Sequence, residues 1–186
     1  MYLSVDFPPE IESWLHRWER RYAGEPQMPF VLSMVEEAMG KGWGGPFGAA
    51  AFSEQGALLA CGVNLVLALD NPLLHAEMTC LARLFAEDVA QRRAPAAPLS
   101  GRDFVLVSSA EPCAMCAGAV NWSRPKRLIY GATRRDVERI GFDEGPKSRG
   151  WAKHLNRSGI DVNAQDSRDL AKAQLMRYRA ERGKLY

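Results

Sequence analysis

Two short stretches of the chain carry side chains that could bind a metal ion. They are His75-x-Glu77 and Pro112-Cys113-x-x-Cys116. An imidazole and two thiolates supply three nitrogen or sulfur ligands, and a catalytic zinc site keeps its fourth position open for water. Bound zinc lowers the pKa of that water to about 7, and Glu77 could take up and return the proton. The residue types therefore predict one catalytic zinc per chain, with His75, Cys113 and Cys116 as ligands.

Each stretch, taken alone, is also compatible with a different role. A Cys-x-x-Cys pair is often half of a structural zinc site or a redox pair. The chain has four cysteines, but Cys61 and Cys80 lack this spacing and lie in apolar surroundings, so we predict that they are core residues. A redox pair would not account for the proline or the His-x-Glu motif. A zinc-stabilised binding module without catalysis is a further alternative, although a structural site has no need for Glu77.

The composition is that of a soluble, single-domain protein. The 186 residues fit one domain, 47% are hydrophobic and 25% are charged. The net charge of +2 gives no strong overall field toward nucleic acid. The charge is uneven, because residues 1–124 carry 9 Lys and Arg against 14 Asp and Glu, whereas residues 125–186 carry 15 against 8. The basic C-terminal third keeps an RNA partner open as an alternative.

Nothing in the sequence indicates a membrane or an export signal. No apolar run approaches the roughly 18 residues of a membrane helix. The first residues lack the basic and apolar regions of a signal peptide. Two of the four cysteines are assigned to metal, which favours a reducing compartment. We therefore expect a cytoplasmic protein with no membrane partner.

Apolar periodicity and turn residues predict alternating helices and strands. Helices are expected over residues 10–22, 29–39, 75–90, 134–140 and 166–182, and from Pro112 onward. Strands are expected over 47–52, 58–66, 104–107, 127–131 and 160–162, with a polar surface loop over 91–101. His75 and Glu77 are two residues apart and cannot share one helical face, so His75 should sit at the cap. This order predicts an α/β sandwich with a mixed sheet covered on both faces.

We expect one domain over residues 1–186. Residues 1–26 would form a helical extension, and residues 164–186 a C-terminal helix and tail. No internal repeat or long linker divides the chain.

The two metal motifs, in this order, resemble the signature of the cytidine deaminase superfamily of zinc-dependent enzymes. The resemblance covers about residues 44–145 and is closest to the guanine deaminase family. It rests on Gly-Gly-Pro-Phe-Gly (44–48), Asn64, Ser-Ala-Glu-Pro-Cys (109–113), Asn-Trp-Ser-Arg-Pro (121–125) and Ile-Gly-Phe-Asp-Glu-Gly-Pro (140–146). It implies a three-layer α/β/α sandwich with about five strands, and Glu77 as the catalytic proton shuttle.

The same resemblance implies further site residues. Glu144 matches a second catalytic acid above the substrate, and Asn64 matches a residue that hydrogen-bonds a purine. Phe47 and Trp122 would line the purine or stack on it. Tyr186 resembles a C-terminal aromatic that can reach the partner's site, which implies a homodimer with exchanged C-terminal segments. From the residues alone, Asn64 could instead cap a turn, and both Phe47 and Trp122 could be core residues.

The resemblance implies hydrolysis of guanine to xanthine and ammonia, without a nucleic-acid partner. Related enzymes act on guanosine, cytosine or triazines such as ammeline, so these substrates stay open. Residues 111–119 also resemble the tRNA adenosine deaminases. However, the Ala-Thr-Arg-Arg-Asp run after Gly131 lacks the Lys-Thr-Gly-type run of that family.

Overall fold

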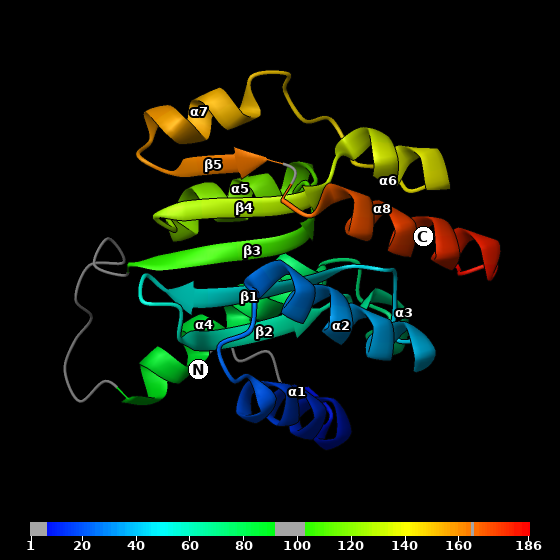
Figure 1. Ribbon diagram of the computed structural model, residues 1–186, viewed down its shortest axis with the longest axis horizontal. Coiled ribbons are helices and arrows are strands. Elements are labelled where there is room, and N and C mark those ends of the chain that lie inside the picture. Colours follow the sequence, from blue (N-terminus) through cyan, green and yellow to red (C-terminus); the bar gives the residue numbers. More distant parts are fainter. Residues whose placement is uncertain (1–6, 92–102, 165) are drawn as a thin grey trace.

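The computed structural model describes residues 7–91, 103–164 and 166–186, and it centres on one five-stranded sheet. The strands are β1 (Gly48–Ser53), β2 (Leu58–Val63), β3 (Phe104–Ala110), β4 (Arg127–Ala132) and β5 (Asp161–Ala164). Their order across the sheet is β2-β1-β3-β4-β5 (Figure 1). Strand β1 is antiparallel to β2 and β3, whereas β3, β4 and β5 run parallel. The predicted mixed sheet is confirmed.

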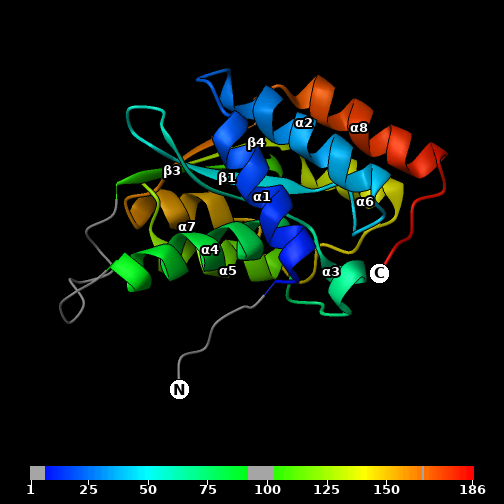
Figure 2. The ribbon, with the colours of Figure 1, turned by 90° about the horizontal axis from the view of Figure 1, so that it is seen from below.

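Helices cover both faces of this sheet (Figure 2). One side carries α2 (Gln27–Gly40), α6 (Arg134–Ile140) and α8 (Arg168–Ala180), and the other carries α4 (Ala76–Gln91), α5 (Ala114–Ser123) and α7 (Trp151–Arg157). Helix α1 (Pro9–Arg21) lies beside the edge strand β2 (Figures 1 and 2). Alternate strand residues point to opposite faces. Ala50 and Val107 therefore join the core beneath α2, whereas Ala49 and Leu106 join the core beneath α4. The three-layer α/β/α sandwich is confirmed.

Several element boundaries differ from those predicted. The strand expected to reach residue 66 ends at Val63, and Val66–Leu69 forms a short helix, α3. Strand β3 continues to Ala110, beyond the expected residue 107. Helix α7 was not predicted, because its seven residues are too few to display an amphipathic repeat. Helix α5 begins at Ala114, so Pro112 precedes the helix instead of lying in its first turn. Except for residue 91, which ends α4, the loop predicted over 91–101 lies outside the described residues.

Helix α1 packs on the body of the domain. Trp14 and Trp18 are 2% and 3% exposed and belong to the core beneath α2. Arg83 of α4 is 5% exposed and forms an ion pair with Glu12 of α1 at 3.1 Å and a second with Glu19. The N-terminal helix is therefore fixed both by apolar burial and by charge. Across the residues described, no helix has the length and apolar character needed to cross a membrane.

Candidate active site

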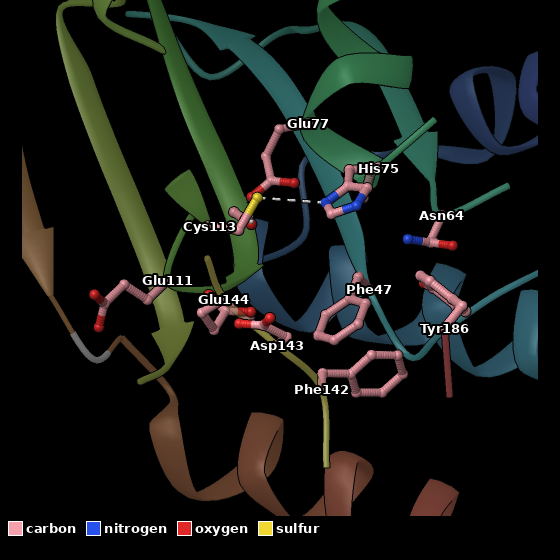
Figure 3. A pocket seen from close by; sticks show the side chains of 13 residues that line it. Phe47, Asn64, His75, Glu77, Glu111, Cys113, Phe142, Asp143, Glu144 and Tyr186 are labelled. Carbon is pink, nitrogen blue, oxygen red and sulfur yellow. Dashed lines mark hydrogen bonds between the residues drawn. The ribbon is translucent and has the colours of Figure 1, made fainter. Parts of the chain in front are cut away.

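The three predicted metal ligands converge from two helix ends. His75 immediately precedes α4, and its carbonyl accepts a hydrogen bond from the Thr79 amide at 2.9 Å. Cys113 is the N-cap of α5, and Cys116 lies in the first turn. The ligand atoms of His75, Cys113 and Cys116 all lie within 4.8 Å of one another, so this metal triad can hold a single ion. Figure 3 shows His75 Nδ1 facing Cys113 Sγ, at 3.5 Å.

The two thiols are prepared for metal binding. The Cys116 amide donates to Cys113 Sγ at 3.5 Å. A hydrogen bond with the Cys116 side chain lowers the pKa of Cys113 to about 4, while the same contact raises the pKa of Cys116. The N-terminus of α5 favours negative charge as well. One thiol is therefore a thiolate at neutral pH, and a cation would replace the proton held on the other.

Glu77 lies in the first turn of α4, beside the metal triad (Figure 3). It is 6% exposed, and Ser108 Oγ of β3 donates to its Oε1 at 3.1 Å. Burial, followed by the negative Cys113, raises the pKa of the Glu77 carboxyl. A carboxyl group with a raised pKa is suited to accept a proton and return it near neutral pH.

Glu144 approaches the same pocket from the loop that follows α6. It is 6% exposed, and its Oε2 has no hydrogen-bond partner within the described part of the chain. Burial, with a contribution from the negative Cys113, raises the pKa of Glu144 to about 8. Its backbone carbonyl accepts a hydrogen bond from the Ala114 amide of α5 at 3.0 Å. Glu144 therefore presents a buried carboxyl group with a raised pKa to the pocket.

Asn64, directly after β2, is 1% exposed and has a fixed amide orientation. Its Oδ1 accepts hydrogen bonds from the Gly45 amide at 3.3 Å and the Val66 amide at 3.2 Å. Its Nδ2 has no partner among the described residues. Because both lone pairs of Oδ1 are used, the group left for a ligand is a donor. Asn64 thus caps a turn, as the alternative predicted, and also lines the pocket.

Aromatic rings form the wall of the pocket that lies opposite His75 and Glu77 (Figure 3). Phe47 packs edge-on against Phe142, with ring centroids 5.0 Å apart, and Phe142 packs in the same way against Tyr186 at 5.3 Å. Tyr186 Oη accepts a hydrogen bond from the Gly45 amide at 3.2 Å. Tyr186 therefore reaches the pocket of its own chain, and no exchange of C-terminal segments is needed to place it there.

The pocket is small, with a cavity volume of about 70 Å³. It is lined by Phe47, Asn64, His75, Ala76, Glu77, Ser108, Ala110, Glu111, Cys113, Phe142, Asp143, Glu144 and Tyr186. Sequence reasoning missed Ser108, Glu111, Phe142 and Asp143 as pocket residues. The last two lie inside the 140–146 run and could have been found there. Ser108 could not, because its role depends on which face of β3 it occupies.

Trp122 does not join the other predicted site residues. It is 77% exposed on α5, and it does not line the pocket of its own chain. The alternative that Trp122 is a core residue is wrong for the same reason. By contrast, Cys61 and Cys80 are fully buried in the two cores, as predicted.

Comparison with known proteins assigns the family. Residues 25–132 match the family described as the cytidine and deoxycytidylate deaminase zinc-binding region. The chain belongs to this deaminase family. The family's zinc requirement agrees with the metal triad, whose nitrogen and sulfur ligands are those that zinc prefers.

Within the deaminase family, the chain is similar to proteins with two activities. It is 39% identical to the guanine deaminase of Bacillus subtilis over 114 residues, which are 61% of this chain and 67% of that protein. It is 32% identical to the tRNA-specific adenosine deaminase of Haemophilus influenzae over 117 residues, 63% of this chain and 62% of that protein. A solved guanine deaminase from Nitrosomonas europaea superposes with a TM-score of 0.80 at 35% identity, covering 96% of this chain and 97% of that one.

Proposed function

We propose that the protein is a zinc-dependent guanine deaminase that converts guanine and water to xanthine and ammonia. Water oxygen forms a bond to the ring carbon that carries the amino group, and the carbon–nitrogen bond then breaks. The observation that carries this proposal is one pocket that combines the metal triad with two buried acids and a fixed amide donor. Zinc bound at the triad would supply an activated water at neutral pH.

Glu77 fits the role of proton shuttle. The reaction needs one group that accepts a proton from the attacking water and delivers it to the ring or to the leaving nitrogen. Glu77 lies beside the ligands, where Ser108 donates to its Oε1 and its carboxyl also interacts with the Cys116 side chain. Burial raises the pKa of Glu77, and a raised pKa suits a carboxyl group that must accept a proton and return it.

Glu144 and Asn64 fit recognition of a polar heterocycle. Each has a buried polar atom without a partner in the described structure, and an unpaired buried polar atom costs about 1–3 kcal/mol. A purine with ring nitrogens, a carbonyl and an amino group can satisfy both. Asn64 can only donate, so it should face a purine acceptor, whereas Glu144, with its raised pKa, could donate a proton to a leaving amine.

The aromatic wall favours a free base as substrate. Phe47, Phe142 and Tyr186 offer flat apolar surface to a planar ring. A second solved structure, a complex with 2,6-diaminopurine, superposes with a TM-score of 0.81 at 35% identity and covers 100% of this chain and 96% of that one. This likeness to a purine-bound protein supports a purine substrate.

The similarity to tRNA-specific adenosine deaminases supports a second candidate, deamination of an adenosine in RNA. Tyr186 of the same chain lines the pocket, where its hydroxyl accepts the Gly45 amide. A tyrosine ring in the pocket wall suits a planar free base. The homodimer and the cytoplasmic location stay predictions.

The test is a spectrophotometric screen of zinc-loaded protein against guanine, guanosine, cytosine, adenosine and ammeline. Glu77→Gln keeps an oxygen for Ser108 and removes the proton shuttle, so guanine turnover should fall by about 100- to 10,000-fold with zinc content unchanged. Arg127→Met, which alters only an exposed ion pair with Asp161, is the matched control. Turnover of tRNA without turnover of any free base would transfer the assignment to the second candidate.

A further inference from the structure

The loop over residues 141–147 is fastened to the metal-binding helix. Within it, the Glu144 carbonyl accepts the Ala114 amide, and the Gly145 amide donates to Asp143 Oδ1 at 2.9 Å. Gly145 has a φ of +67°, and a Cβ there would lie 3.2 Å from the Ala114 Cβ. The loop therefore packs closely on the start of α5. Glu144 Oε2 has no hydrogen-bond partner in the described chain, so this loop must hold the carboxyl in place.

Lys147, at the end of this loop, adds a second attachment. Its ammonium group lies 2.7 Å from Glu111 Oε1, donates to the Pro112 carbonyl, and sits 4.6 Å from the centre of the Trp151 ring. The Lys147 side chain is 3% exposed and that of Glu111 is 11% exposed. The other Glu111 oxygen accepts the Arg134 amide at 3.0 Å. This cluster joins three separate segments of the chain beside the pocket.

Stability alone does not account for the burial of this ion pair. Removing an ammonium and a carboxylate from water costs about as much as their attraction returns, and apolar residues of similar volume often stabilise a protein more. The location of the Lys147–Glu111 pair offers another reason for its burial. Pro112 directly precedes the ligand Cys113, and Lys147 directly follows the turn that carries Glu144. The ammonium therefore links the backbone of a metal ligand to the backbone of the second acid.

We propose that Lys147 is a positioning residue, which fixes the Glu144 loop against the segment that carries Cys113. Lys147 does not line the pocket, so it acts through Glu144 and does not touch the substrate. This inference rests on the proposed function. It predicts that loss of the ammonium lets Glu144 move away from the reacting atoms while the metal triad stays intact.

The first experiment is Lys147→Met together with the double variant Glu111→Gln/Lys147→Met, which leaves no unpaired buried charge. We expect kcat on guanine to fall by about 10- to 100-fold in both, since a displacement of about 1 Å can cost that much. KM should stay within about threefold, and zinc content should stay at one per chain. Amide hydrogen exchange at Ala114, which donates to the Glu144 carbonyl, should become faster. Arg127→Met should change none of these quantities.

A double-mutant cycle separates positioning from general damage. In a Glu144→Gln background, Lys147→Met should cause little further loss of kcat, because the residue through which it acts is already disabled. An equal further loss in that background would overturn the inference, as would an unchanged kcat in the single variant of an active enzyme. Wild-type protein that turns over no base would instead overturn the proposed function, and this inference with it.

Discussion

Tyr186 provides a test of whether each site is built from one chain. Its hydroxyl bonds the Gly45 amide and its ring packs against Phe142. A neutral hydrogen bond contributes about 1 kcal/mol, and an aromatic pair contributes about 1 kcal/mol more. Tyr186→Ala should therefore lower kcat/KM for guanine by roughly 30-fold, since each 1.4 kcal/mol is tenfold. Tyr186→Phe keeps the ring and should lose only about fivefold.

The decisive assay mixes two inactive or weakened chains. Tyr186→Ala and Glu77→Gln would be co-expressed and purified as one assembly. If each tail serves its own site, as the structure places it, every site in the mixture lacks one group and activity is not restored. If the tails were exchanged between subunits, a mixed dimer would contain one complete site. Recovery of activity beyond the sum of the separate variants would refute own-chain placement of Tyr186.

Three further outcomes follow from the site and its supports. Asn64→Asp keeps an acceptor for both backbone amides but loses the free donor, so kcat/KM should fall by about 10- to 100-fold in steady-state kinetics; an unchanged value would contradict the donor role. Arg168 holds the pKa of Asp136 well below its usual range, so this pair stabilises the fold above about pH 4 and loses that effect as the pH falls further. Asp136→Asn should then unfold at a lower temperature than wild type at pH 7, with the gap narrowing as the pH falls below about 4 in thermal scans; a gap independent of pH would be the contrary result. Chelation should lower the unfolding temperature and abolish turnover, and Cys113→Ser should reduce zinc measured by mass spectrometry below one per chain; full occupancy of that variant would remove Cys113 from the ligand set.

The metal triad was predictable because the residue spacing within two short motifs specifies it. The spacing of Cys113 and Cys116 puts both at the start of one helix, and the two-residue separation of His75 and Glu77 requires His75 to precede its helix. Both expectations hold in the structure. The succession of strands along the chain was predictable for the same reason, since apolar runs and turns mark each strand. The limits of β2 and β3 were not, because hydrogen-bond pairing decides where a strand stops.

The position of Trp122 shows what local patterns leave out. An aromatic residue in a familiar run suggested a wall of the pocket or a core position. Helix α5 buries Cys116, Val120 and Ser123, which recur at helical spacing, and Trp122 falls outside that stripe. The helical spacing of the buried residues therefore indicates correctly that Trp122 is exposed. The pocket contacts of Tyr186 depended instead on the path of a distant segment, which no local pattern specifies.

The attachment of α1 has a consequence for association between chains. Strand β2 is an edge of the sheet, and unpaired backbone groups on an edge can add a strand from another molecule. Side chains block this at Cys61, whose amide donates to Glu19 Oε1 at 3.3 Å and whose carbonyl accepts from Arg83 at 3.0 Å. Glu19 of α1 and Arg83 of α4 thus shield the edge together. Loss of this helix would expose both an apolar core and a strand ready to template aggregation.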